Sequence, residues 1–151
     1  MLALSIRPAL AGIADSPLPV LEAGKITLHL YSVPGVIDAN GLGTFFSCTS
    51  TATSPITVGV ELFSVFGAVF NNAATSSLSL IPGETRIFAT STAVGISVDS
   101  SLGGVGKGSA RILATSKNLV CTAFVADNTA LPAGSGWQLT IIAKTKQKAA
   151  N

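Results

Sequence analysis

Short runs in which apolar and polar residues alternate, separated by turn residues, recur along most of this chain and constrain its fold more than any other feature. In the clearest run, 26–31, alternation places Thr27, His29 and Tyr31 together on the polar face of a strand. No segment keeps the period of a helix over several turns. The pattern predicts about nine short strands, at 26–31, 42–49, 56–66, 77–80, 85–90, 96–99, 110–115, 119–125 and 138–145.

These strands fit one antiparallel domain. A chain of 151 residues has room for a single core, and a parallel sheet is not expected because no helices separate the strands. We therefore expect an all-β sandwich or barrel of about 7–9 strands over residues 25–148. The first strand should end at Val33-Pro34-Gly35. Residues 1–24, with three prolines and no periodicity, should form a leader or an extended arm.

The start of the chain bears on where the protein works. Residues 1–6 resemble part of the apolar region of a secretory signal, and Ala9-Leu10-Ala11 has the small-x-small form of a cleavage site, although Arg7 and Pro8 interrupt the run. No stretch of roughly 18 apolar residues occurs, so no transmembrane segment is expected. These features predict a secreted or cell-surface protein.

A turn and its two flanking strands resemble a known kind of module. The segment 78–88, in which Pro82-Gly83-Glu84 joins two strands, is similar to a segment of bacterial extracellular immunoglobulin-like modules of the CARDB and fibronectin type III kind. The hairpin expected at 46–63 is similar to theirs as well, and the similarity in pattern covers residues 26–145. The resemblance implies an antiparallel immunoglobulin-like β-sandwich used for adhesion, spacing or assembly. Trp137 departs from the antibody-domain pattern, which places a tryptophan between the cysteines.

The two cysteines, Cys48 and Cys121, both lie in apolar, β-prone runs. A pair in two distant core strands matches the inter-sheet disulfide of immunoglobulin-type sandwiches, and such a bond would indicate an oxidising compartment. The alternative is two buried free thiols. A structural zinc site is not expected, because His29 is the only histidine.

The sequence offers little for catalysis, and we expect no enzyme activity and no cofactor. His29 is the only imidazole that could activate a nucleophile, and no two carboxylates are brought together by their spacing. The glycine-rich stretch 103–109 lacks the P-loop pattern, since Gly106-Lys107 is followed by glycine. A net charge of +2 is too small to hold a nucleic-acid backbone, so no nucleic acid is expected as a partner.

One binding hypothesis starts from the low charge of the chain. Charged residues make up only 11% of it, and within Val58–Phe70 the only charge is Glu61. We expect a structural or adhesion module that forms homo-oligomers, as in an extracellular filament, or binds another extracellular protein, with the arm as a strand donor. The alternative for 58–70 is the central strand of a monomeric sandwich.

The second hypothesis is a sandwich that binds a surface glycan or a peptide. Trp137 follows a loop that contains glycine and proline and could stack on a ligand, joined by Tyr31 and His29 from the polar face of the first strand. Packing of Trp137 in the core is the alternative. Three lysines near the C-terminus would share one face of the last strand, as a solvated edge or as a contact with an acidic surface: Lys144, Lys146 and Lys148.

Overall fold

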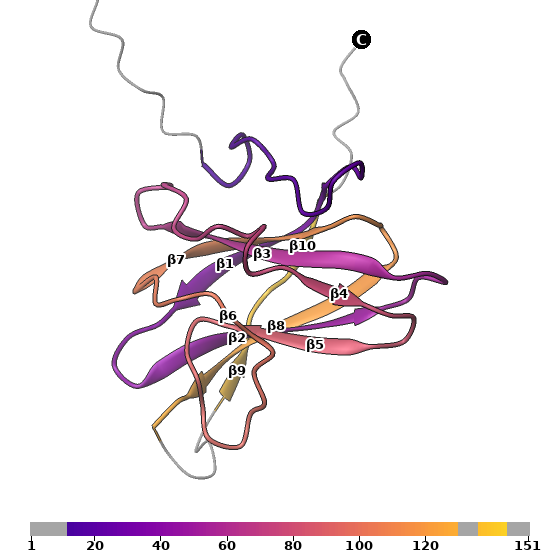
Figure 1. Cartoon of the computed structure of the whole chain (residues 1–151). Coiled ribbons are helices and arrows are strands. Elements are labelled where there is room, and N and C mark those ends of the chain that lie inside the picture. The colour runs from indigo at the N-terminus through magenta and orange to yellow at the C-terminus, as the bar shows by residue number, and fades with distance from the viewer. Residues whose placement is uncertain (1–11, 130–135, 145–151) are drawn as a thin grey trace, which may run out of the picture.

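The computed structural model describes residues 12–129 and 136–144. In these ranges ten strands form two five-stranded sheets that lie face to face, and no helix occurs (Figure 1). The strand order is β10-β1-β7-β3-β4 in what we call the first sheet and β6-β5-β2-β8-β9 in the second sheet. Neighbouring strands are antiparallel except for β5 and β6. The prediction of an all-β sandwich is confirmed. The strands are β1 (Leu28–Ile37), β2 (Leu42–Ser50), β3 (Ile56–Ser64), β4 (Leu78–Leu80), β5 (Thr85–Ala89), β6 (Ser100–Ser101), β7 (Lys107–Ala114), β8 (Leu119–Asp127), β9 (Gly136–Gln138) and β10 (Ile142–Ala143).

Strand β1 differs from its expected range. It runs through Val33-Pro34-Gly35, which we predicted would end it, and reaches Ile37. The pairing with β7 shifts register between Pro34 and Val36, and Gly35 has a φ of 79°. A bulge at this point accommodates the proline and the glycine, so the strand continues beyond them. The predicted end of the first strand was therefore wrong.

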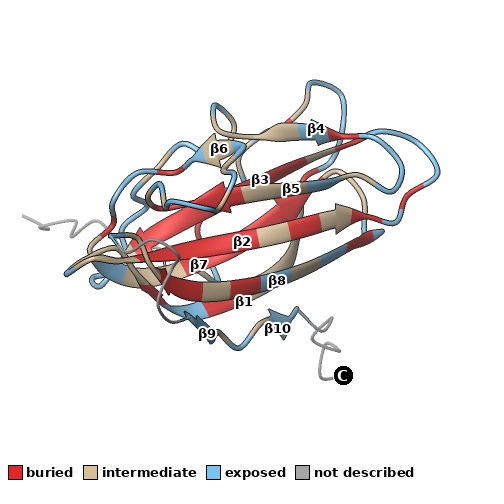
Figure 2. Ribbon diagram, turned by 90° about the horizontal axis from the view of Figure 1, so that it is seen from below, coloured by how far each residue is buried: buried red, intermediate tan, exposed pale blue. Residues whose placement is uncertain are grey.

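The C-terminal strand is divided between the two sheets. The range expected as one strand, 138–145, contributes to β9, which pairs with β8, and to β10, which pairs with β1. Both short strands lie at the margin of the sandwich and are exposed (Figure 2). The range 96–99 holds no strand; an isolated bridge joins Ala93 to Ile96, and β6 follows.

The core lies between the sheets, where alternation along β2, β3 and β7 places their apolar side chains. Large parts of these three strands are coloured as buried in Figure 2. Phe46, Val60 and Ile112 are completely buried there. Strand β3 is buried on both faces, because Glu61 and Phe63, which point away from this core, are inaccessible as well. As far as Ser64, where β3 ends, the structure therefore agrees with the alternative expectation, that the first part of 58–70 is a central strand of the sandwich.

Residues 12–27 cover the outer face of the first sheet and contain no strand (Figure 1). Leu21 from this segment packs with Ala73 and Leu113 in a second, smaller core. Gly59 on β3 leaves the room for it, since a Cβ at that position would lie 2.9 Å from Leu21 Cδ2. We call residues 12–24, the described part of the expected arm, the N-terminal segment. This segment is thus packed on the first sheet of its own domain.

Candidate functional site

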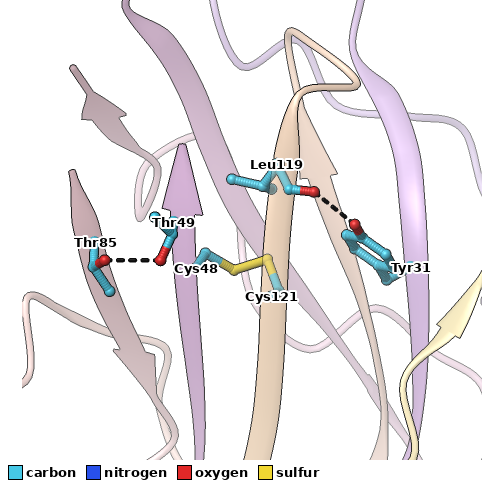
Figure 3. Close-up of a disulfide and its surroundings, with 6 residues drawn as sticks. All are labelled: Tyr31, Cys48, Thr49, Thr85, Leu119 and Cys121. Atoms are coloured by element: carbon cyan, nitrogen blue, oxygen red, sulfur yellow. Dashed lines mark hydrogen bonds between the residues drawn. A yellow bond between two sulfur atoms is a disulfide. The ribbon is translucent and has the colours of Figure 1, made fainter. Parts of the chain in front are cut away.

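Cys48 and Cys121 form a disulfide, and it lies within one sheet. The two residues are direct cross-strand partners in β2 and β8, with their Cα atoms 4.2 Å apart (Figure 3). The expected inter-sheet bridge was therefore wrong, because β2 and β8 are neighbours, and the spacing of two cysteines does not distinguish neighbouring strands from facing ones. Cys48 is completely buried and Cys121 packs against the same core, so the bond faces the space between the sheets.

Tyr31 lies in the interior near this disulfide. Its hydroxyl donates a hydrogen bond of 2.6 Å to the backbone carbonyl of Leu119, which links β1 in the first sheet to β8 in the second (Figure 3). We predicted that Tyr31 shares a face with His29, and this was wrong, because the pairing of β1 with β7 shifts register between these two residues. The bulge turns Tyr31 towards the core, where it is partly buried. Its hydroxyl is used within the fold.

His29 lies on the outer face of the first sheet and is half-buried. Its Nε2 atom lies 3.1 Å from the Tyr31 carbonyl oxygen and 3.0 Å from Ser32 Oγ. A carbonyl can only accept, so Nε2 carries the proton and Nδ1 accepts from the Lys144 ammonium, 3.4 Å away. Burial, followed by the positive charges of Lys144 and Arg111, lowers the pKa of His29 from 6.5 to about 4.

The surroundings of His29 are poorly suited to nucleophilic catalysis. A catalytic histidine needs a pKa near the working pH and a carboxylate that orients its ring. Here the pKa is low, and the second ring nitrogen faces Lys144 instead of a carboxylate. Ser32 is within hydrogen-bond distance of the ring, but this imidazole is too weak a base to activate it efficiently.

Trp137 lies on β9 at the edge of the second sheet, where it pairs with Val125. Its side chain is 56% exposed, so it is not packed in the core. A hollow of about 410 Å³ lies close by in sequence, lined by Cys121, Thr122 and residues 138–141, and Trp137 is not part of its lining. The loop 130–135, which precedes Trp137, lies outside the described residues. The structure does not bring Trp137, Tyr31 and His29 together.

A buried ion pair on the outer face of the first sheet was not predicted. Glu61 on β3 and Arg111 on β7 are cross-strand partners, and Arg111 Nε donates to Glu61 Oε2 over 2.6 Å. Only 1% of the Arg111 side chain and 6% of the Glu61 side chain are exposed. Burial raises the pKa of Glu61, and the positive charge of Arg111 opposes that rise. The sequence carried a signal, because Glu61 is the only charge of the expected strand 56–66 and Arg111 the only charge of the expected strand 110–115.

Arg111 also fastens the N-terminal segment to the sheet. Its two terminal nitrogens donate to the backbone carbonyls of Ser16, at 2.9 Å, and of Pro17, at 2.8 Å. Its guanidinium carbon lies 5.1 Å from the centre of the Phe63 ring, within the range of a cation–π contact. The N-terminal segment covers this ion pair and is bound by Arg111. The pair therefore has a structural role, because it holds the segment on the sheet.

The loop that follows β3 exposes a cluster of apolar side chains. The chain turns at Gly67 and comes back alongside β3, with a bridge from Phe63 to Val69 and a hydrogen bond from Phe70 N to Leu62 O. We call residues 65–70 the 65–70 loop. Phe66 is 81% exposed, and three other apolar side chains of the loop are at least 46% exposed: Val65, Val69 and Phe70. The sequence pattern identified this apolar stretch but placed its beginning inside a strand.

A groove lies between the N-terminal segment and the β1–β10 edge of the first sheet. Its volume is about 850 Å³, and its lining includes Leu18, Leu28, His29 and Lys144. Of the three lysines expected to share one face, only Lys144 is described, directly after β10; Lys146 and Lys148 lie outside the described residues.

Among residues 12–129 and 136–144, no group of three or more His, Cys, Asp or Glu side chains could hold a metal ion. Within the same ranges there is no helix of the length and apolarity that crossing a membrane requires. In comparisons with known proteins, no family model, no curated protein and no solved structure matches this chain.

Proposed function

We propose that this protein is an exported, non-enzymatic structural module that self-associates through the 65–70 loop. The observation that carries the proposal is the exposure of Val65, Phe66, Val69 and Phe70 within one short loop that has no charged residue. Contiguous apolar surface is unfavourable in water, and on soluble proteins it commonly marks a surface that a partner covers. A second copy of the chain supplies the same apolar loop, so the contact would be self-complementary.

Export is supported by the disulfide between Cys48 and Cys121. Disulfides form and persist in oxidising compartments, whereas thiols in the cytosol are kept reduced. The small share of charged residues, 11%, is in keeping with a module that works within an assembly. The low pKa and the lysine neighbour of His29 support the non-enzymatic part of the proposal.

Sedimentation velocity of the full chain over a range of concentrations tests self-association. We expect the wild type to associate as its concentration rises and Phe66→Glu to remain monomeric, because a carboxylate placed in the contact would lose its hydration. Ile26→Glu is the matched control, since Ile26 is 79% exposed and lies outside the loop. A wild type that stays monomeric at all concentrations, or an equal effect of both substitutions, would contradict the proposal.

A second candidate function is the binding of a glycan or peptide by Trp137. The exposed indole favours it, because an accessible tryptophan at a strand edge offers a flat apolar surface with one donor. Binding to a glycan array should then be lost in Trp137→Ala and kept in Phe66→Glu. Unchanged binding in Trp137→Ala would exclude this residue as the contact surface.

A further inference from the structure

The groove beside β1 has apolar walls formed by three different parts of the chain. Ile13 and Leu18 contribute from the N-terminal segment, Leu28 from β1 and Ile142 from β10. Its volume of about 850 Å³ is in the range of small-molecule sites, which are mostly apolar with a few polar groups. This groove does not include the 65–70 loop, so it is a separate surface from the one proposed for self-association.

The charged side chains that line the groove are both positive. They are Lys117 and Lys144, and no Asp or Glu belongs to the lining. In the part of the chain that the structure describes, neither ammonium group forms a salt bridge with a carboxylate. Arg111 lies beneath the N-terminal segment, and its charge is already paired with Glu61. The groove therefore presents unpaired positive charge next to apolar surface.

The two lysines lie towards the same end of the groove. Lys144 N donates to Leu30 O, which fixes Lys144 beside the start of β1. Lys117 follows the end of β7, where Ala114 is the cross-strand partner of Leu28. The N-terminal segment crosses further along β1, because its carbonyls are held by Arg111, the partner of Ser32. The site is thus positive at one end and apolar further along.

We propose that this groove binds a single-chain carboxylate amphiphile, such as a fatty acid. The alkyl chain would lie against Leu18 and Ile142, further along β1, and the carboxylate would be bound by Lys144 and Lys117. Burial of the alkyl chain supplies most of the affinity, because apolar surface is removed from water. The two ammonium groups select an anionic head group over a neutral or cationic one.

The test is a calorimetric titration of the full chain with dodecanoate below its micelle concentration. Dodecanol and dodecyltrimethylammonium have the same alkyl chain with a neutral and a cationic head group. We expect saturable one-to-one binding of dodecanoate, binding of dodecanol about tenfold weaker, and no binding of the cation. Lys144→Met and Lys117→Met should each weaken dodecanoate binding by about tenfold. Lys107→Met, a lysine substitution outside the groove, should leave it unchanged.

A substitution in the wall tests the position of the alkyl chain. Ile142 is 53% exposed on a short edge strand, so Ile142→Asp should leave the fold intact and should abolish dodecanoate binding. Phe66→Glu should bind dodecanoate normally, which separates this proposal from self-association through the 65–70 loop.

Three results would overturn the proposal. The first is the absence of saturable dodecanoate binding by the wild type, and the second is an equal loss of binding in Lys107→Met and Lys144→Met. The third is a wild-type dimer that binds no dodecanoate and dissociates on Ile142→Asp, because the occupant of the groove would then be a second copy of the chain.

Discussion

His29 is the only histidine of the chain, and in the folded protein its ring stays neutral well below neutral pH, because its pKa is lowered to about 4. In the unfolded chain the ring titrates near its ordinary pKa of 6.5. Between these values the unfolded chain binds more protons than the folded one, so the free energy of unfolding falls as the pH is lowered from 6.5 towards 4. The ring is only partly buried, so after allowing for solvent screening we expect a loss of about 1 kcal/mol.

Urea unfolding at neutral pH and at about pH 5 measures this loss in the wild type and in His29→Gln. Glutamine keeps a donor for the Tyr31 carbonyl but does not titrate. The raised pKa of Glu61 has the opposite effect on the pH dependence, because the stability that Glu61 contributes is lost as the pH rises through its folded-state pKa. Glu61 is present in both the wild type and His29→Gln. The difference between the two proteins therefore belongs to His29, and identical pH dependence in both would contradict the assignment.

The buried pair of Glu61 and Arg111 should be sensitive to the loss of one partner. Glu61→Ala leaves the Arg111 charge without its carboxylate in a site where both side chains are almost inaccessible. We expect a loss of about 3 kcal/mol in the free energy of unfolding, measured by urea unfolding. Replacing both, as Glu61→Leu with Arg111→Met, should recover much of this loss, because no unpaired charge remains. A double variant less stable than Glu61→Ala would contradict this view of the pair.

At the scale of elements, the packing of the N-terminal segment on the first sheet requires a glycine at position 59 in β3. A Cβ added at Gly59 would lie 2.9 Å from Leu21 Cδ2 and 3.0 Å from the Ala73 carbonyl oxygen. We expect Gly59→Ala to displace residues 12–24 from the sheet, at a cost of about 1–3 kcal/mol. Hydrogen–deuterium exchange should then rise in peptides that cover residues 12–24 and stay slow in β2 and β8.

Gly12→Ala is the control for this substitution. A Cβ at Gly12 would meet only Asp15 Oδ1, at 3.8 Å, so exchange in the N-terminal segment should not change. Faster exchange throughout both sheets in Gly59→Ala would show that the substitution unfolds the domain, and the segment would then not be a separately docked element.

The strands could be predicted from the sequence because alternation reports which residues face a core, and this held for β2, β3 and β8. The bulges in β1 could not be predicted from the sequence, because a bulge inserts one residue and reverses the alternation of the residues that follow it. For that reason Tyr31 was assigned to the wrong face. Strand order cannot be derived from a single sequence either. For that reason we expected the disulfide to join the two sheets, although β2 and β8, which carry its cysteines, are neighbours in one sheet.

The candidate sites were predicted less well than the strands. The groove is made by residues from four separate parts of the chain, which no local pattern connects: the N-terminal segment, β1, the turn between β7 and β8, and β10 with Lys144 after it. The ion pair of Glu61 and Arg111 depends on the register of β3 and β7, which is set by packing across the whole sheet. The 65–70 loop was visible as an apolar stretch, but its exposure follows from the end of β3 at Ser64.

At the scale of the whole molecule, the disulfide closes a loop of the chain that contains β3 to β7. Cys48 and Cys121 are 73 positions apart in the sequence, and the strands that they join also share a continuous hydrogen-bonded ladder. The native sheet therefore does not depend on the bond for its pairing. The bond acts mainly on the unfolded chain, whose conformational freedom it reduces, and for a loop of this length the stabilisation is about 4 kcal/mol.

Reduction should accordingly weaken the protein without changing its fold. We expect Cys48→Ala with Cys121→Ala, and the wild type in dithiothreitol, to keep the far-ultraviolet spectrum of a β protein and to unfold at lower urea concentration. Both should lose about 4 kcal/mol in the free energy of unfolding. Because the bond faces the space between the sheets, it should resist reduction until the domain opens, so the rate of thiol release should follow the rate of unfolding. Rapid release of thiols from the folded protein would contradict a purely structural role for this disulfide.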